Sequence, residues 1–332
     1  MSAKTLEELA EKLKVSRRTI SRALKNDANV ASETRRRILD YLEKDKYFPN
    51  VHAASLASKK INVIGLIFPK NAFLHADFFA IDTIKGAAKF ANENNYQLMM
   101  FTQNKFDSDQ CLQMYKSKLV GGLMIVAISK DDTEKIEELR KNHVPVSLLF
   151  AYSDAVDSFG CDNKRGGYIA TKHLIDSGRK RIAFIHGHEN WFDSAERFEG
   201  YKKALEEAGM PFRQEYVERG YFRYEDAQEA TKKLMALDKP PDGIFSANDR
   251  MAIGVIRALK VGGKKVPEDV SVIGFDNIPI CDFFDPPITT VAQPVMEIAY
   301  TAGNDLLDSI NSPHKKPRLR LLEPNLVIRK SA

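Results

Sequence analysis

The sequence predicts a multidomain protein in which a small all-α domain is followed by a larger α/β region of two subdomains. Two observations support this fold class. The first 60 residues carry apolar side chains at helical spacing, with signals for three short helices. The remaining 272 residues alternate short apolar runs with amphipathic helical stretches, a pattern typical of parallel sheets covered by helices. This second region is long enough for two separate cores.

The first predicted helix begins after Thr5, which forms a capping box with Glu8. Its apolar stripe occupies positions i, i+3, i+4 and i+7, namely Leu6, Leu9, Ala10 and Leu13. After a turn through Lys14, Ser16 is expected to cap a second helix, and a third is expected from about Glu33 to Lys44. The side chains predicted to pack inward from these two helices are Ile20, Ala23, Leu24, Ile38, Leu39 and Leu42.

The outward face of the second predicted helix carries only polar side chains, Arg17, Arg18, Ser21 and Arg22. A solvated helix face is the alternative interpretation of such a run. The charge distribution favours DNA, because residues 1–60 contain 14 Lys and Arg against 8 Asp and Glu, whereas the remaining residues are close to neutral. Three short helices with one basic outward face therefore indicate a helix-turn-helix domain that neutralises phosphates.

Individual roles on this face follow from side-chain chemistry. An arginine near the start of a recognition helix, such as Arg18, can donate two hydrogen bonds to guanine O6 and N7. Ser16 and Thr19 are expected to contact phosphates and to set the register of the helix on DNA.

A longer pattern runs through the first 57 residues. It comprises Thr5-Leu6, Val15-Ser16, Thr19-Ile20-Ser21-Arg22, Val30, Thr34-Arg35, Tyr47, Pro49-Asn50, Ala53 and Leu56-Ala57. These positions resemble the DNA-binding domain and hinge of the LacI family of bacterial repressors. One departure is the turn, where this chain carries Leu13-Lys14 at a position that tolerates left-handed dihedral angles.

The resemblance implies base contacts from Arg17, Arg18 and Arg22, and a wedge at Leu56 that enters the minor groove and kinks the operator. A short linker helix with a buried leucine is the alternative for Leu56. The residues expected to contact DNA are Thr5, Ser16, Arg17, Arg18, Thr19, Ser21, Arg22, Asn29, Ala53 and Leu56.

The strands expected beyond residue 61 are short apolar runs: Val63–Phe68, Gln97–Phe101, Gly122–Ala127, Val144–Leu149, Arg181–His186, Gly243–Ala247 and Val270–Phe275. The helices expected between them are Thr83–Glu93, Asp131–Asn142, Gly166–Asp176, Arg197–Ala208, Glu225–Leu237 and Arg250–Val261. This alternation favours a parallel sheet in each half of the region. Sheets of this kind bind ligands at the carboxyl ends of their strands.

Five motifs in this region also match the family: Asp162-Asn163-x-x-Gly166-Gly167, Arg197-x-x-Gly200-Tyr201, Ala247-Asn248-Asp249-x-Met251-Ala252-x-Gly254, Gly274-Phe275-Asp276-Asn277 and Asn325-Leu326-Val327-x-Arg329. The resemblance implies a periplasmic-binding-protein-like sensor of two Rossmann-like subdomains that dimerises and closes on a small effector. It places the helix-turn-helix domain at 1–48, a hinge helix or linker at 49–61, and the sensor at 62–332. The two subdomains of the sensor comprise 62–161 with 294–323, and 162–293 with 324–332.

The expected effector-binding residues combine motif matches with looser candidates for apolar walls and stacking: Arg197, Asn248, Asp276, Phe79, Phe222 and Trp191. A guanidinium and a carboxylate can hold adjacent hydroxyls of a sugar while aromatic rings cover its C–H surface. The alternatives are a solvated Arg197, a turn cap at Asp276 and core positions for the two phenylalanines. Asp249 is expected to cap the helix that begins at Arg250.

No cofactor, metal site or catalytic centre is predicted. His186 and His188, which should face the same side of a strand, have no third ligand placed by the sequence. Cys111, Cys161 and Cys281 lack paired spacing, which fits a reducing cytoplasm. There is no nucleophile elbow or Walker loop, so an enzyme is not expected. The sequence shows no membrane span and no secretion signal, which argues against a periplasmic sugar-binding protein.

The sequence thus predicts a dimeric, cytoplasmic repressor of carbohydrate-metabolism genes that binds double-stranded operator DNA. A sugar or sugar phosphate is the expected effector, and its binding is expected to release the operator. Control by a protein corepressor, or by a non-sugar ligand such as a nucleobase acting as corepressor, is the alternative.

Overall fold

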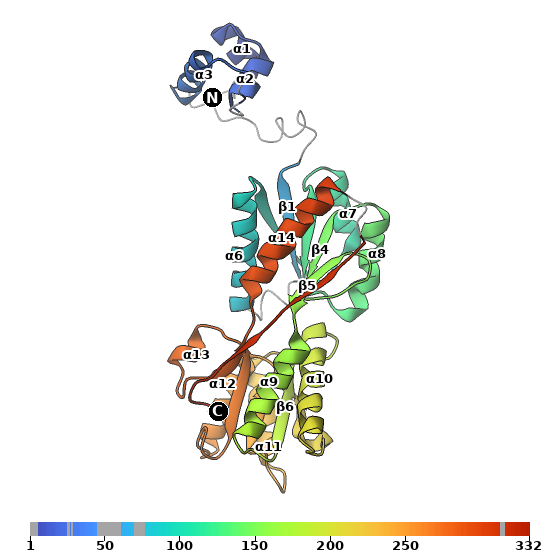
Figure 1. Ribbon diagram of the computed structural model, residues 1–332, viewed down its shortest axis with the longest axis vertical. Coiled ribbons are helices and arrows are strands. Elements are labelled where there is room, and N and C mark those ends of the chain that lie inside the picture. Colours follow the sequence, from blue (N-terminus) through green and yellow to red (C-terminus); the bar gives the residue numbers. More distant parts are fainter. Residues whose placement is uncertain (1–5, 25–26, 28, 45–60, 70–76, 313–315) are drawn as a thin grey trace. The chain divides into compact units, whose positions relative to one another are not determined.

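The computed structural model describes residues 6–24, 27, 29–44, 61–69, 77–312 and 316–332. The chain forms two compact units, Met1–Ile61 and Asn62–Ala332. In the described residues the first unit is helical, and the second contains two six-stranded sheets (Figure 1). The predicted fold class, a small all-α domain followed by an α/β region with two sheets, is confirmed.

The first unit packs α1 (Leu6–Leu13), α2 (Arg17–Leu24) and α3 (Ser32–Lys44) around one apolar core. The buried side chains of this core are Leu9, Leu13, Ile20, Ala23, Val30, Ile38 and Leu42. The prediction was wrong for Leu24 and Leu39, which are 38% and 41% exposed. Leu24 is the last residue of its helix, and Leu39 follows a core residue by one position, which turns its side chain about 100° away.

The turn between α1 and α2 contains a residue in the left-handed region, Lys14, with a φ of 51°. The amide of Val15 donates to the carbonyl of Ala10 at 3.1 Å, which closes the turn behind it. Ser16 Oγ accepts a hydrogen bond from the amide of Thr19 at 3.0 Å, so the predicted cap of the second helix is confirmed. Lysine therefore adopts the left-handed conformation that this position was expected to tolerate.

The first sheet of the second unit has the strand order β11-β5-β4-β3-β1-β2, and all its pairs are parallel. Its strands are β1 (Val63–Pro69), β2 (Gln97–Gln103), β3 (Gly122–Val126), β4 (Val146–Leu149), β5 (Asp157–Cys161) and β11 (Leu319–Leu322). The helices packed on it are α6 (Asp77–Glu93), α7 (Ser108–Lys116), α8 (Thr133–Lys141) and α14 (Val295–Asn311), with the short 3-10 helix η1 (Lys130–Asp132) before α8. Helices α6 and α14 cover one face, while α7 and α8 cover the other. We call this the first subdomain.

The second sheet has the order β12-β10-β9-β8-β6-β7, and only the β10–β12 pair is antiparallel. Its strands are β6 (Ile182–His186), β7 (Val217–Arg219), β8 (Gly243–Ser246), β9 (Ser271–Asp276), β10 (Thr289–Ala292) and β12 (Asn325–Val327). The helices of this second subdomain are α9 (Asn163–Asp176), α10 (Phe192–Glu207), α11 (Tyr224–Met235), α12 (Asp249–Val261) and α13 (Ile280–Phe283), with η2 (Gln214–Tyr216) before β7. Its apolar core is separate from the two clusters that flank the first sheet.

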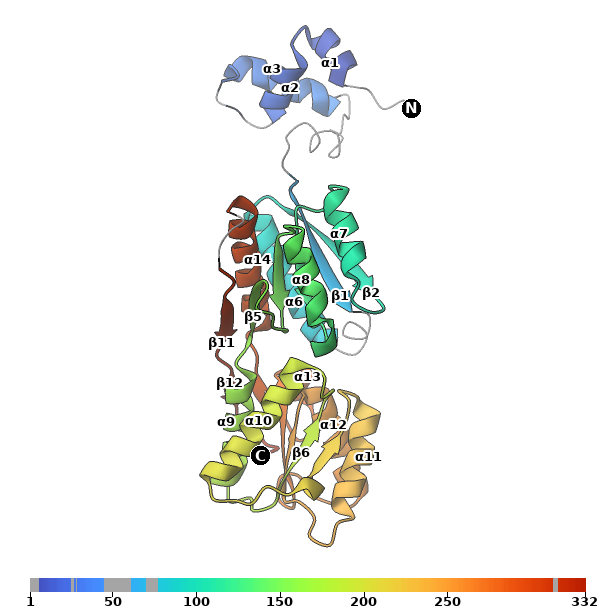
Figure 2. The same ribbon diagram turned by 90° about the vertical axis from the view of Figure 1, so that its right-hand side faces the viewer.

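The chain passes between the subdomains three times: from β5 to α9, from β10 to α14, and from β11 to β12 (Figure 2). The carboxyl ends of the parallel strands in both sheets point toward this boundary, whereas the antiparallel strand β12 runs away from it. A backbone hydrogen bond also crosses the boundary between the subdomains: the amide of Lys130 donates to the carbonyl of Asn190 at 3.0 Å. The strand ends of the two sheets therefore meet at one place, as expected for a ligand site in an α/β protein.

The seven predicted strands are all present, but five short strands were missed: β5, β7, β10, β11 and β12. Strand β5 illustrates the reason. Its sequence, Asp157-Ser158-Phe159-Gly160-Cys161, has no apolar run, yet all five residues are buried between neighbouring strands. That burial comes from the packing of the sheet and leaves no periodic signal in the sequence.

Helices α9 and α10 approach each other closely because glycines line their contact. A Cβ added at Gly167 would lie 2.1 Å from the carbonyl oxygen of Arg197, and one at Gly200 would lie 2.1 Å from that of Lys164. Only a hydrogen atom fits in these spaces. This contact positions α10, which carries the predicted effector residue Arg197 and follows directly after Trp191. Within the described residues, no helix is both long and apolar enough to cross a membrane.

Candidate DNA-binding surface and effector site

The polar face of α2 is exposed at Arg17 and Arg18 and half-buried at Ser21 and Arg22. Arg17 and Arg18 lie at the surface, whereas Ile20 and Ala23 on the opposite side are buried. Arg17 forms an ion pair with Glu7 of α1, in which both side chains remain more than 60% exposed (64% and 67%). Among the described residues Arg18 makes no ion pair, so its guanidinium is available to a ligand.

Arg22, in the last turn of α2, and Asn29, in the connection that follows it, both contact Asp27. Arg22 Nε lies 3.2 Å from Asp27 Oδ2, and Asn29 donates to Asp27 Oδ1 from its amide and its side chain, each at 2.9 Å. These hydrogen bonds from Asn29, helped by Arg22, lower the pKa of Asp27. Asn29 is exposed but orients this loop, which adds a structural role to the DNA contact expected of it.

The rest of the predicted DNA-binding set is partly described. Ser21 is half-buried on α2, and Ser16 and Thr19 share a 2.8 Å hydrogen bond between their hydroxyl groups. Thr5, Ala53 and Leu56 lie outside the described residues, as do residues 49–60 of the hinge expected at 49–61.

A second candidate site is marked by backbone strain in the α/β unit. Six residues other than glycine have a positive φ directly at or after the carboxyl end of a strand: Ala127, Phe150, Tyr221, Phe222, Asp276 and Asn277. Such angles are unfavourable for side chains of this size, and they persist where the surrounding structure imposes them. Their concentration at the strand ends of both sheets points to the boundary between the subdomains as the functional region.

Arg197 lies at the centre of this region on α10, with only 2% of its surface exposed. Its Nε donates to Asn163 Oδ1 at 2.9 Å, and its Nη1 donates to the carbonyl of Ala247 at 2.5 Å. The guanidinium also lies 3.7 Å from the centroid of the Phe275 ring. The alternative of a solvated arginine is therefore excluded, because this cation is buried and held by α9, β9 and the end of β8.

Two carboxylates flank the Arg197 guanidinium. Asp193 Oδ2 lies 3.8 Å from Nη2, and Asp276 Oδ1 lies 3.9 Å from Nη1. Asp276 also accepts a hydrogen bond of 2.6 Å from Gln293 Nε2, and its φ is 117°. Burial raises the pKa of Asp276, and Arg197 opposes this effect. The structure therefore brings the predicted pair Arg197 and Asp276 together and adds Asp193, which sequence reasoning missed although it lies one helical turn before Arg197.

Asn248, and not Asp249, caps α12. Asn248 Oδ1 accepts from the amide of Met251 at 2.9 Å, so Asn248 caps α12 and has only its side-chain NH₂ left for a ligand. Asp249 is fully buried and accepts from Thr290 Oγ1 at 2.5 Å and from the amide of Ile278 at 2.9 Å. The prediction that Asp249 caps this helix was wrong, because its carboxylate instead joins α12 to the strands beside it.

An aromatic cluster lies at the carboxyl ends of β6 and β7. The ring of Trp191 lies 5.9 Å from that of Phe222 and 5.6 Å from that of His188, and His188 lies 5.4 Å from Tyr221. A Cβ on Gly187 would overlap the ring of Phe222, which shows how closely the ring covers the backbone. Two of the predicted residues, Trp191 and Phe222, therefore form one wall, and His188 and Tyr221 extend it.

Phe79 contributes from the first subdomain. Its half-buried ring meets Phe150 edge-on, with 4.5 Å between the centroids. Phe79 and Trp191 pack against the same apolar cluster of the first subdomain, and Trp191 also packs against the core of the second. Trp191 thus touches both subdomains, which makes it sensitive to their relative movement.

Polar contacts tie the two subdomains together beside this wall. Tyr152 from the first subdomain lies 3.3 Å from Glu196 Oε2 on α10, and the Tyr152 ring meets that of Phe192 at 5.1 Å. Burial raises the pKa of Glu196 to about 6. Asn190 Nδ2 donates to Asp131 Oδ2 at 3.0 Å.

His186 and His188 do not act as a pair. Strand β6 ends at His186, whose Nδ1 lies 3.1 Å from Ser194 Oγ, whereas His188 belongs to the aromatic wall. The prediction that they face the same side of a strand was wrong, because the strand ends between them. Burial lowers the pKa of His186 to about 4. Among the described residues, no group of three possible metal ligands lies together.

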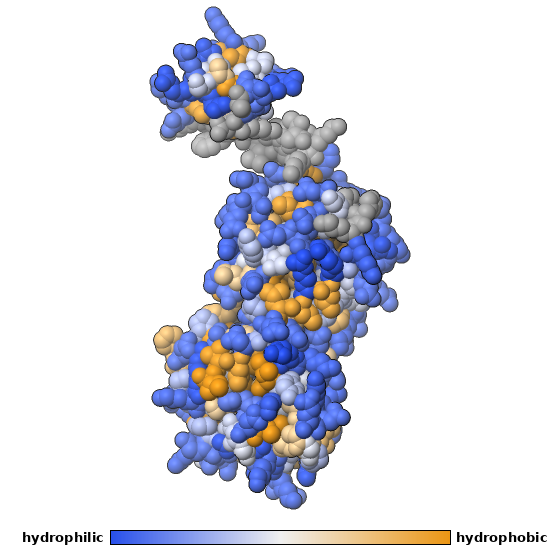
Figure 3. Space-filling model, in the orientation of Figure 1, coloured by the Kyte–Doolittle hydropathy of each residue, from blue (hydrophilic) through white to orange (hydrophobic). Residues whose placement is uncertain are grey.

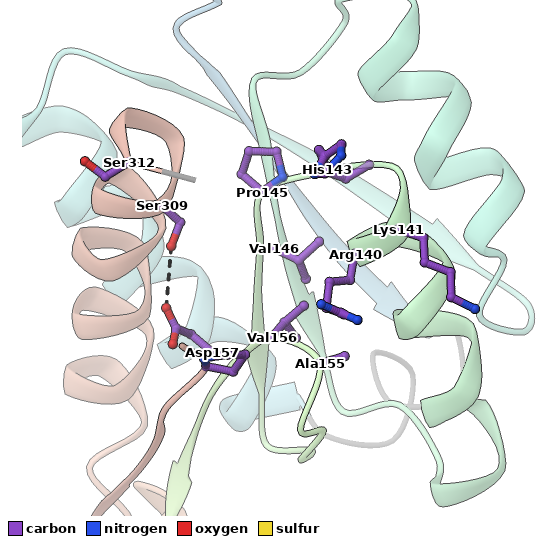
Figure 4. Close-up of a pocket in the computed structure, with 12 residues that line it drawn as sticks. Arg140, Lys141, His143, Pro145, Val146, Ala155, Val156, Asp157, Ser309 and Ser312 are labelled. Atoms are coloured by element: carbon purple, nitrogen blue, oxygen red, sulfur yellow. Dashed lines mark hydrogen bonds between the residues drawn. The ribbon is translucent and has the colours of Figure 1, made fainter. Parts of the chain in front are cut away.

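A cavity of about 350 Å³ lies elsewhere, at the amino ends of β4 and β5 (Figure 4). Arg140, Lys141 and His143 line one side of it, and Ser309 and Asp157 line the other. It lies at the opposite end of the first sheet from the predicted residues. None of them contributes to it.

Comparisons with known proteins agree with this architecture. Residues 5–50 match the bacterial regulatory proteins of the lacI family, and residues 171–332 match the periplasmic binding protein-like domain. The probable HTH-type transcriptional repressor ExuR of Bacillus subtilis (strain 168) is 34% identical over 333 residues, which cover 98% of each chain.

Two solved structures extend the comparison. The transcriptional regulator CelR in complex with cellobiose has a TM-score of 0.76 at 27% identity, covering 99% of this chain and 100% of its own. The lac repressor dimer bound to operator and the anti-inducer ONPF has a TM-score of 0.88 at 24% identity, covering 99% of each chain, and shows the common fold. The small helical unit, the two-sheet unit and the full-length identity to a repressor together show that this chain belongs to the LacI family of bacterial regulatory proteins.

Proposed function

We propose that this protein is a homodimeric repressor that binds operator DNA through α2 and releases it when a small polyhydroxylated effector binds between the subdomains. The observation that carries the effector half of the proposal is the buried Arg197, held between Asp193 and Asp276 beside an aromatic wall. In this proposal residues 1–48 bind DNA, 49–61 form the hinge, and 62–332 form the sensor. Because its target is genomic DNA, the protein works in the cytoplasm.

The charges at the site favour an uncharged effector over a phosphate ester. Among the described residues that surround Arg197, one guanidinium faces the two carboxylates of Asp193 and Asp276. A phosphate dianion would add negative charge to this group, whereas hydroxyl groups can donate to the carboxylates and accept from the guanidinium. The related regulator CelR was solved with cellobiose, a neutral sugar, which agrees with this choice.

Release follows from differential binding to two arrangements of the subdomains. An effector that touches Trp191 and Arg197 on one side and Phe79 on the other favours a closed arrangement, because only that arrangement completes all its contacts. If the two arrangements hold the DNA-binding units of a dimer differently, the effector and the operator each weaken the binding of the other by the same factor.

The decisive experiment uses Trp191, the only tryptophan of the chain, as a fluorescent reporter. Full-length protein is titrated with neutral sugars, polyols, sugar phosphates and nucleobases. We expect a saturable change in Trp191 fluorescence with at least one neutral sugar or polyol, and the same compound should release a labelled operator. A phosphorylated or nucleobase ligand as the only active compound would contradict the neutral-effector assignment, and a silent panel would favour control by a protein corepressor.

Base readout is tested by replacing Arg18 with alanine. We expect sequence discrimination to fall by about 1–3 kcal/mol at one position in each half-site, because a bidentate arginine contact is lost. The matched control is Arg36→Ala, which removes another exposed positive charge, from α3. Selection from a randomised operator pool gives the measurement. Equal base preferences in the two variants would remove Arg18 from base recognition.

The dimer contact is proposed to include α13 of the second subdomain. Phe283 is 84% exposed and Ile280, one turn earlier, is 41% exposed, so the short helix presents an uncovered apolar face. Figure 3 shows apolar side chains gathered in patches on the second unit. The related lac repressor was solved as a dimer on its operator, which supports the same assembly here.

Replacing Phe283 with glutamate is expected to raise the dimer dissociation constant at least tenfold, because a charge would be buried without a partner. Gln214→Glu, which adds the same charge at another exposed position, is the control. Sedimentation velocity over a concentration series measures both. A dimer of unchanged stability would place the interface elsewhere, and a monomeric parent protein would contradict the dimer itself.

A further inference from the structure

A small basic pocket opens at the end of the second subdomain opposite to the candidate effector site. It has a volume of about 190 Å³ and lies at the amino ends of β6 and β8 and beside η2 before β7. Four of its lining residues are cations, Lys180, Arg181, Arg213 and Lys239, and no acidic side chain lines it. None of the residues proposed to contact DNA or the effector lines this pocket.

Two of the four cations are already neutralised. Arg181 Nη2 lies 3.2 Å from Asp242 Oδ2, and Arg213 Nη1 lies 3.7 Å from Glu215 Oε1. Among the described residues, Lys180 and Lys239 have no ion-pair partner. The pocket therefore keeps an excess of two positive charges from two lysines.

The backbone at both lysines is fixed even though their ammonium groups are unpaired. The amide of Lys180 donates to Asp242 Oδ1 at 3.0 Å, and the carbonyl of Lys239 accepts from Tyr216 Oη at 2.8 Å. Tyr216 itself is 5% exposed, so this anchor is rigid. Fixed attachment points reduce the entropy lost when the two side chains close on a ligand.

The remaining surface of the pocket is apolar. Ile182, Leu205 and Met210 contribute side chains from β6, α10 and the loop after α10. A volume of about 190 Å³ corresponds to roughly six water molecules at about 30 Å³ each. This space accommodates a phosphate group and a short carbon chain.

We propose that this pocket binds a small phosphorylated metabolite, with its phosphate between Lys180 and Lys239 and its carbon chain on the apolar surface. A phosphate dianion matches the charge of two lysines, which bind phosphate as point charges. The proposal is independent of the effector site, because it uses none of the residues around Arg197.

The test is isothermal titration calorimetry of the full-length protein with glycerol 3-phosphate, inorganic phosphate and glycerol. We expect one equivalent of glycerol 3-phosphate to bind, weaker binding of inorganic phosphate, and none of glycerol. The double variant Lys180→Gln/Lys239→Gln should weaken glycerol 3-phosphate binding at least tenfold. The control Lys116→Gln/Lys118→Gln, which removes two exposed lysines from the first subdomain, should bind like the parent protein.

Several results would overturn the proposal. These are the absence of saturable binding, equal losses in the two double variants, and binding of glycerol that matches that of its phosphate. Phe222→Leu separates this pocket from the effector site, because Phe222 packs on Trp191 and in the core of the second subdomain and does not line the basic pocket. Binding lost in Phe222→Leu but retained in the Lys180/Lys239 variant would place the phosphate at the effector site instead.

Discussion

Replacing Arg197 with methionine is expected to abolish effector-dependent release of operator DNA and to lower the free energy of unfolding by about 3–5 kcal/mol. The stability loss arises because Asp193 and Asp276 would remain in a region with little water after their shared cation is removed. Asn163 Oδ1 and the carbonyl of Ala247 would also lose their donors. Operator binding in the absence of effector should persist where the variant is folded, since α2 belongs to the other unit.

Two further variants separate folding from effector response. Arg197→Lys keeps the charge but cannot form the paired hydrogen bonds of a guanidinium, so we expect a folded protein with a weakened response. Arg140→Met is the matched control, because Arg140 pairs with Glu137 at the surface of the first subdomain, where such pairs contribute about 0–1 kcal/mol. Chemical denaturation and operator titration with effector measure both quantities. Normal induction in a folded Arg197→Met protein would exclude this residue from the effector site.

Replacing Gly167 with alanine is expected to destabilise the protein by about 2 kcal/mol and to weaken effector binding at the same time. The new methyl group would lie 2.1 Å from the carbonyl oxygen of Arg197, so α9 and α10 would have to separate. Overpacking of this kind costs about 1–3 kcal/mol, and here the obstacle is backbone, which cannot rotate away. Alanine would otherwise gain about 1 kcal/mol over glycine in a helix, so a net loss indicates the clash.

Gly262→Ala provides the comparison for this substitution. Gly262 follows α12 with a φ of −78°, and the nearest atoms to an added Cβ are 3.4 Å away. We expect its stability to stay within about 1 kcal/mol of the parent protein. Thermal unfolding and the effector titration by Trp191 fluorescence should be measured on both variants. If Gly167→Ala were as stable as Gly262→Ala and bound effector normally, the α9–α10 contact would not position Arg197.

Much of the fold could be predicted from local features of the sequence. The apolar spacing of Leu9 and Leu13, the cap at Ser16 and the polar face from Arg17 to Arg22 each depend on residues within one or two helical turns. The same holds for the buried strands β1, β3 and β6, whose continuous apolar runs are visible without knowledge of their partners. Signals that act over a few residues are contained in the sequence itself.

The candidate effector site could be predicted only in outline. The sequence by itself determined that Arg197 belongs to a helix and Asp276 to the end of a strand in an α/β sensor. Local periodicity and short motifs are sufficient to place both residues in these elements. Only the tertiary structure decided that these two side chains meet, that Asp193 joins them, and that Asn248 rather than Asp249 caps α12. It also decided the burial of β5 and the exposure of Leu39. The meeting of Arg197 with Asp276 and the burial of β5 depend on contacts between segments far apart in the sequence, where packing, and not local propensity, sets the free energy of each arrangement.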